Sequence, residues 1–161
     1  MFQIGDIVLY RLLLAQIEHI EERNGIKYYH LASLESENCC YDVPVQNRLQ
    51  HLRTLPSKEE ALALLDLLPS LPTVSITRNA VDRSCKNILD QYDIKPWLSL
   101  LKTLFIDKTH AETAGKKFVE SEKRYYRIIF ARMSIILSVA MHEERSIVEQ
   151  QLLTSLERSI R

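Results

Sequence analysis

The pattern of apolar and polar residues divides the chain into an N-terminal part with a two-residue period and a C-terminal part with a helical period. Residues 7–10 are apolar, β-branched or aromatic, which favours a strand. Gly5 gives the backbone the freedom to turn into this strand. Because a single apolar strand is not stable alone, we expect the next forty residues to supply partners for a small sheet.

Three further strands are predicted before residue 50. Residues 12–20 alternate loosely, and the Asn24-Gly25 pair that follows is a strong hairpin signal. Residues 26–31 are expected to form the returning strand, and residues 39–43 another strand that Pro44 ends. Strands spaced by about ten residues predict a small, strongly curved antiparallel barrel or sheet.

The period changes after residue 56. Ser57 and Glu60 have the spacing of a capping box, in which each side chain binds the backbone N–H of the other residue. An apolar-faced helix is predicted to follow, and residues 69–72, which contain two prolines, stop it. The predicted fold class is α+β: a small β domain over residues 1–55, a helix and linker over 56–72, and an all-helical domain over 73–161.

Four helices are predicted in the last part. Asn79 is expected to cap the first, and Asp93 the second, which has Pro96 in its first turn. The second helix is expected to end at Phe105, with a polar connection after it. The predicted ranges of these segments are 81–92 and 94–105 for the two helices, 106–115 for the connection, and 119–141 and 144–160 for the last two helices.

The long helix predicted at 119–141 has two opposite faces. Lys123, Arg124 and Arg127 lie on one side at 100° per residue, and Lys116 and Lys117 extend this basic face from the preceding connection. Basic faces of this kind bind phosphates, which provide most of the affinity for nucleic acids. A solvated surface is the alternative. The opposite face carries the expected core residues Ile129, Met133, Ile136, Leu137 and Ala140.

Composition sets the broad class. Hydrophobic residues make up 46% and charged residues 26%, as in globular proteins, and no apolar run reaches the length of a membrane span. No signal peptide is expected, and an odd count of three cysteines suggests a reducing cytoplasm. Residues 1–72 carry 6 Lys and Arg against 10 Asp and Glu, whereas residues 73–161 carry 15 against 11. This asymmetry suggests two surfaces with different partners, although offsets of this size also arise by chance.

No motif of an enzyme or of a metal site is recognised. The chain lacks phosphate-binding glycine loops, a nucleophile elbow and zinc-protease spacing. Alternation along residues 12–20 puts His19 on the face of Ile17, opposite Glu18. We therefore expect no catalytic residues, no cofactor, no metal and no small-molecule substrate. The histidines are scattered, none at ligand spacing with a cysteine: His19, His30, His51, His110 and His142.

Together these segments resemble the CarD/CdnL family of bacterial transcription regulators. The resemblance covers nearly the whole chain and keeps the family order of a β domain followed by helices. The opening strand and the V-P-V strand end are the more specific parts of it. The matching stretches are F-Q-I-G-D-I-V-L-Y at 2–10, I-E-H-I-E-E-R at 17–23, Y-D-V-P-V-Q-N at 41–47, S-K-E-E-A at 57–61 and E-K-R-Y-Y-R-I-I-F-A-R at 122–132.

The resemblance implies a Tudor/SH3-like barrel that binds the β subunit of RNA polymerase by laying an edge strand against it. The polymerase-binding residues it implies are Arg23, Tyr41, Asp42 and Val43. The family has a basic residue at the position of Asp42, so the charge is reversed here. The family's Y-P-x-x-G after the first strand is also replaced, by Y-R-L-L-L.

The resemblance further implies that the helical domain rests on promoter DNA and stabilises the open complex, in the cytoplasm and associated with the nucleoid. Binding would be driven by the DNA backbone and shape, with an aromatic wedge. The family's R-x-x-K motif is present as Arg83 and Lys86, and the basic residue of its E-K pair as Lys123. Val81 stands where the wedge tryptophan is expected, and Trp97 is predicted to be a core residue instead.

Two main functional hypotheses follow, and an unrelated fold or an enzyme is the third alternative. The first is a regulator that binds polymerase and promoter DNA, with Arg83, Lys86, the basic face of the long helix, Lys116 and Lys117 as DNA contacts. The second is a protein–protein adaptor that keeps the partner-binding β domain but has lost DNA binding. Asp42, Val81 and the zero net charge favour the second hypothesis.

Overall fold

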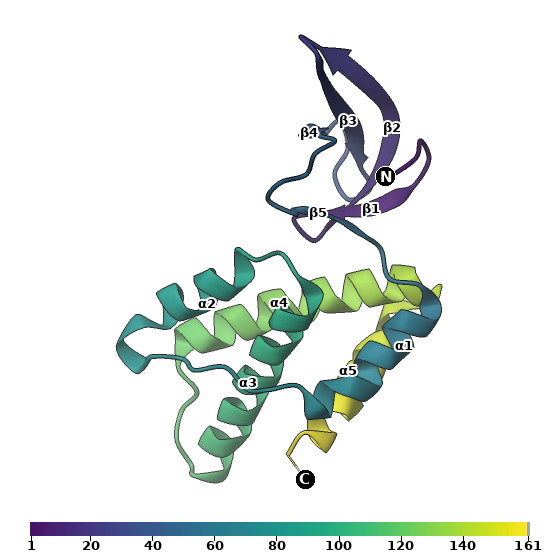
Figure 1. Ribbon diagram of the computed structural model, residues 1–161. Coiled ribbons are helices and arrows are strands. Elements are labelled where there is room, and N and C mark those ends of the chain that lie inside the picture. Colours follow the sequence, from purple (N-terminus) through teal and green to yellow (C-terminus); the bar gives the residue numbers. More distant parts are fainter. Residues whose placement is uncertain (161) are drawn as a thin grey trace. The chain divides into compact units, whose positions relative to one another are not determined.

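The computed structural model describes residues 1–160, and the chain forms two compact units, Met1–Leu55 and a second that begins at Pro56 (Figure 1). The first is a five-stranded antiparallel sheet and the second contains the five α-helices of the described residues. The expected α+β class is confirmed. Among the described residues, no helix has the length and apolar character needed to cross a membrane.

The sheet has the strand order β4-β3-β2-β1-β5. Because β4 and β5 are its two ends and do not pair with each other, the sheet is not closed, and the predicted barrel is not confirmed. The last strand was missed in the sequence, since it has only three residues and no alternation. The bounds are β1 Ile7–Tyr10, β2 Leu13–Arg23, β3 Ile26–Ser33, β4 Cys40–Pro44 and β5 Leu52–Thr54.

Two tight turns build the hairpins. Asn24 and Gly25 join β2 to β3 with φ of 53° and 79°, as the sequence predicts for a turn with two left-handed residues. Arg11 and Leu12 join β1 to β2 with φ of 51° and 59°. This second turn uses residues that seldom adopt positive φ, so no sequence signal marks it.

A β-bulge changes the face on which His19 lies. Ile17 pairs with Leu31 but His19 pairs with His30, so Glu18 is one residue more than the ladder requires. The predicted alternation is therefore wrong at this point: Ile17 is buried, whereas Glu18 and His19 are both exposed. The core on the other face is formed by Val8, Ala15, Ile17, Tyr29, Leu31, Val43 and Leu52.

The helical unit begins with α1 (Lys58–Leu67), and the predicted capping box between Ser57 and Glu60 is present. Helix α1 contacts α4 and α5 within this unit. The expected cap Asn79 is wrong, because it lies in a short 3₁₀ turn and Ala80 precedes the helix. The remaining helices are α2 Val81–Leu89, α3 Ile94–Thr113, α4 Glu120–Met141 and α5 Arg145–Arg158.

Helix α3 continues through most of the segment predicted as a polar connection. Its polar last turns are compatible with a helix because Thr109 and Thr113 donate their hydroxyls to carbonyls one turn back, Phe105 and Thr109. Trp97 is buried and its indole N–H donates to the carbonyl of Leu89, so its predicted core role is confirmed. The predicted apolar stripe of α4 is also buried: Ile129, Met133, Ile136, Leu137 and Ala140.

Candidate functional site

Strand β4 is an edge of the sheet, and its hydrogen-bond pattern can be followed residue by residue. At one end Ser33 N–H donates to the Cys39 carbonyl (2.9 Å), and at the other Val45 N–H donates to the Lys27 carbonyl (3.0 Å). Both pairs fit the antiparallel register between β3 and β4. Because hydrogen-bonded and non-hydrogen-bonded pairs alternate in such a ladder, the direction of every backbone group between them is fixed.

The alternation directs the backbone groups of Tyr41 and Val43 toward β3 and those of Cys40 and Asp42 toward the outer edge. Pro44, which has no N–H, also occupies an outward position, where a proline costs no ladder bond. The outer edge of β4 therefore presents the N–H and C=O groups of two successive outward residues. Such an edge can accept another strand.

A cavity of about 480 Å³ lies beside this edge in the first unit. Its walls include Tyr10, Tyr28, Val43, Pro44 and Leu49, so much of the surface is aromatic or apolar. Leu49 is 75% exposed, so the apolar lining of the cavity is open to solvent. The groove could therefore receive an apolar side chain from a partner strand.

The predicted polymerase-binding residues do not all face solvent. Val43 is buried in the core of the sheet, so its side chain supports the fold. Tyr41 packs against Tyr10 with ring centroids 4.9 Å apart and accepts a hydrogen bond from Cys39 Sγ. Arg23 and Asp42 are exposed.

Arg23 and Asp42 are brought together. Arg23 Nη2 lies 2.9 Å from Asp42 Oδ2, and Arg23 Nε lies 3.6 Å from Glu21 Oε2. The guanidinium also lies over the Tyr28 ring, 4.7 Å from its centroid. The hydrogen bond from His30, followed by Arg23, lowers the pKa of Asp42. Asp42 is therefore paired with the arginine to which the resemblance assigns partner binding.

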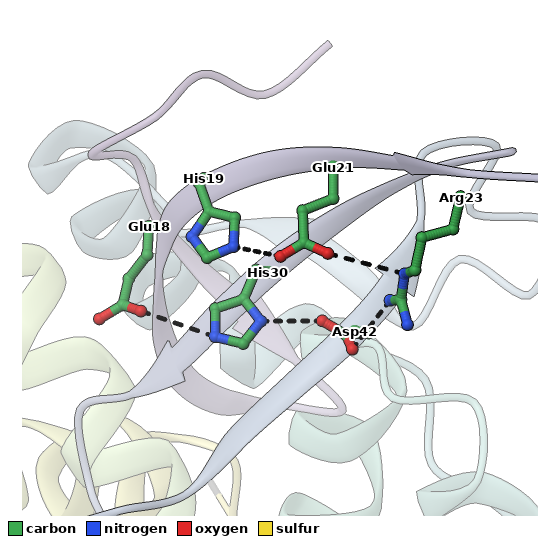
Figure 2. A network of polar contacts seen from close by, with 6 residues as sticks. All are labelled: Glu18, His19, Glu21, Arg23, His30 and Asp42. Atoms are coloured by element: carbon green, nitrogen blue, oxygen red, sulfur yellow. Dashed lines mark hydrogen bonds and ion pairs between the residues drawn. The ribbon is translucent and has the colours of Figure 1, made fainter.

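A network of exposed and half-buried polar side chains covers the outer face of β2, β3 and β4 (Figure 2). His19 Nε2 lies 2.5 Å from Glu21 Oε1, and the His19 and His30 rings are stacked with centroids 4.4 Å apart and planes at 16°. His30 Nδ1 lies 2.8 Å from Asp42 Oδ1. On its other side, His30 Nε2 lies 3.7 Å from Glu18 Oε2.

Sequence reasoning missed this network. A signal for part of it exists, because a two-residue turn at Asn24-Gly25 pairs residues equally far from it, and His19 and His30 are each five residues away. No comparable signal places Glu18 on the same face, since that depends on the bulge.

The predicted DNA-binding residues of α2 and α4 are all exposed: Arg83, Lys86, Lys123, Arg124 and Arg127. Arg124 is held in place, because its Nη2 lies 2.8 Å from Asp82 Oδ1. The Tyr125 hydroxyl donates to the same oxygen at 2.8 Å. These two contacts join α4 to α2 and bring their basic residues onto adjacent helices.

Lys116 and Lys117 lie in the segment between α3 and α4. They line a cavity of about 400 Å³ with Arg78, which the sequence did not single out, and with Asp107 and Glu122. Burial raises the pKa of both carboxyl groups, which share a hydrogen bond.

Val81 lines the same cavity and is only 8% exposed. The position at which the resemblance implies a DNA wedge is thus turned inward. The lining of this cavity includes an aromatic residue, Phe118, which is half-buried.

No protein-family model matches the chain, and a search of curated proteins returned no match.

Proposed function

We propose that the chain is a CarD-like transcription regulator that binds the RNA polymerase β subunit through its first unit and promoter DNA through its helical unit, in the nucleoid of a bacterial cytoplasm. The observation that carries the proposal is the open edge of β4 beside an apolar groove, in the stretch where the sequence resembles the polymerase-binding strand of that family. The strand order and the two-residue turns support a Tudor-like domain whose sheet is partly open.

The partner strand adds to β4 through backbone hydrogen bonds with Cys40 and Asp42. Leu49 and the tyrosines of the groove then contact its side chains. Since Arg23 is paired with Asp42, electrostatic attraction contributes less here than a free arginine would give. Binding through the edge and the groove depends only weakly on salt.

On the DNA side, Arg83 and Lys86 of α2 and Lys123 and Arg127 of α4 contact phosphates without reading bases. Arg124 supports this surface through Asp82. With Val81 buried there is no inserted wedge, so the protein holds melted DNA less tightly than a regulator that unstacks a base step.

The polymerase contact is tested with Cys40→Pro, which removes one outward N–H without removing a ladder bond. Cys40→Ala is the matched control, because Cys40 is exposed and its side chain is lost in both variants. Binding of the purified polymerase β lobe is measured by biolayer interferometry. We expect Cys40→Ala to bind like the wild type. Cys40→Pro should bind at least about tenfold more weakly, because it loses roughly one hydrogen bond to the partner strand at an edge from which water is excluded. Equal binding by both variants, or no binding by the wild type, rejects the proposal.

The DNA contact is tested by fluorescence anisotropy of a labelled promoter duplex over a series of salt concentrations. The double variant Arg83→Ala/Lys86→Ala is expected to weaken binding. It should also reduce the slope of log K against log salt concentration by the amount that about two lost phosphate contacts produce. Arg158→Ala, which removes an exposed arginine from α5, is the control and keeps the wild-type slope.

A protein–protein adaptor is the second candidate, favoured by the buried Val81 and by the Asp82 carboxylate that occupies Arg124. The two functions separate in one experiment. Polymerase binding together with a flat salt dependence of DNA binding identifies the adaptor, whereas a steep dependence identifies the regulator.

A further inference from the structure

We propose that the outer face of β2 and β3 binds a divalent transition-metal ion, with Glu18, His19 and His30 as its ligands. Each of these residues offers a ligand atom within 4.8 Å of the atoms offered by the other two. Figure 2 shows that the carboxylate of Glu18 and the two imidazoles meet at one end of the network. This inference is independent of the proposed function.

The distances are close to those of a bound ion. His30 Nε2 and Glu18 Oε2 lie 3.7 Å apart, too far for a hydrogen bond. Zinc bonds of about 2.0–2.1 Å in a tetrahedron place neighbouring ligand atoms roughly 3.3 Å apart. An ion between these two atoms therefore requires a movement of only a few tenths of an ångström, and Glu18 is exposed enough to make it.

Each histidine already has the second partner that metal-bound histidines need. His30 Nδ1 lies 2.8 Å from Asp42 Oδ1, which fixes the ring so that Nε2 faces Glu18. His19 Nε2 lies 2.5 Å from Glu21 Oε1, which leaves Nδ1 to bind the ion. Carboxylates that accept the other ring N–H select the tautomer and strengthen the ligand.

One movement is required. Imidazole lone pairs lie in the ring plane, and two rings stacked at 16° cannot both direct a lone pair at one ion. The His19 ring must turn about its side-chain bonds. That side chain is 46% exposed, and the rotation gives up its stacking on His30 and moves its contact with Glu21.

Charge and donor type indicate the kind of ion. Glu18, Glu21 and Asp42 are three carboxylates, with Arg23 as the one guanidinium among them in the network (Figure 2). The network therefore has excess negative charge for a dication to neutralise. Imidazole donors favour zinc, copper or nickel over magnesium or calcium. Three protein ligands leave at least one position of the ion to water.

The test is isothermal titration calorimetry of the untagged full chain with ZnCl₂, in neutral to weakly alkaline buffer. We expect one equivalent to bind to the wild type. His30→Gln and Glu18→Gln should each weaken binding at least about tenfold, and Asp42→Asn, which removes the partner of His30, about 10- to 100-fold. His142→Asn is the control, because it removes an exposed histidine outside the network and should change nothing.

Nitrogen-detected NMR of the histidine rings gives a readout that folding defects do not imitate. Zinc should shift the ring signals of His19 Nδ1 and His30 Nε2 and leave those of His142 unchanged. Circular dichroism of each variant confirms that it folds. No binding by the wild type overturns the proposal, as does binding that survives His30→Gln but is lost in Cys40→Ala, which would assign the ion to the exposed thiol.

Discussion

Arg23 and Asp42 form an ion pair across a strand to which neither belongs. Arg23 lies at the end of β2 and Asp42 on β4, with β3 between them, and the guanidinium reaches Asp42 over the Tyr28 ring. Both side chains are about half exposed, so the pair adds only roughly 0–1 kcal/mol to stability. Its larger effect is on binding, because it occupies the cation that the resemblance assigns to the polymerase.

Replacing the acid by a base should release that cation. We expect Asp42→Lys to bind the polymerase β lobe roughly tenfold more tightly than the wild type at low salt, since it frees Arg23 and adds a charge. Asp42→Asn frees Arg23 without adding a positive charge, so its affinity should lie between those of the wild type and Asp42→Lys. Biolayer interferometry at low and high salt measures both. Unchanged affinity of Asp42→Lys would show that this corner of the sheet does not meet the partner.

The corresponding acid of the helical unit is Asp82. Asp82→Asn should release Arg124 and raise the affinity for a promoter duplex. The salt dependence of binding should become steeper by the amount that about one added phosphate contact produces. Asp90→Asn, at the other end of α2, removes the same charge without touching Arg124 and serves as control. Anisotropy titrations measure both variants. If the two variants bind equally, net charge and not Arg124 sets the affinity.

The Asp107–Glu122 pair should make the helical unit sensitive to pH. Burial raises the pKa of both groups, so the folded chain holds protons that the unfolded chain has already lost. Stability therefore falls as the pH rises from about 4 through the folded-state pKa. Asp107→Asn should flatten this fall, whereas Asp66→Asn on α1 should not. Chemical unfolding at mildly acidic and neutral pH gives the comparison, and an equal fall in both variants contradicts the assignment.

Lys102 should contribute strongly to stability. It is 7% exposed, and its ammonium donates to the carbonyls of Pro69 (2.7 Å) and Leu71 (2.6 Å), which fixes the segment after α1. Lys102→Met keeps most of the side chain but leaves both carbonyls without this donor, at a cost of about 2 kcal/mol. Lys95→Met, at an exposed position of α3, is the control. Urea unfolding measures the difference, and similar midpoints for both would refute the role.

The elements that could be predicted from the sequence are those with local signals. Asn24-Gly25 marks its own turn, the Ser57–Glu60 box marks the start of α1, and the apolar stripe of α4 follows from helical geometry alone. The Arg11-Leu12 turn and the three residues of β5 have no such signal. They are fixed by pairing with β1, which lies far from β5 in the sequence.

The candidate sites divide in the same way. Exposure of the basic residues on α4 follows from the period of one helix. The partners of those residues do not, because Asp82 and Arg124 are 42 positions apart and meet only when α2 packs on α4. The histidine network depends on the register of three strands, and its third ligand on an irregularity in one of them.

The β-bulge at Glu18 has a consequence for how the length of β2 can vary. Deleting a residue inside a strand normally exchanges the two faces beyond the deletion, which unfolds a small sheet. Deleting Glu18 does not, because the ladder already skips it: His19 would still point outward and Ile20, half-buried against the core, inward. We expect this shortened chain to fold with near-native stability in thermal melts, whereas deletion of the neighbouring Gln16 should prevent folding. Position 18 is thus a place in this sheet where nature could add or remove a residue at little cost to the fold.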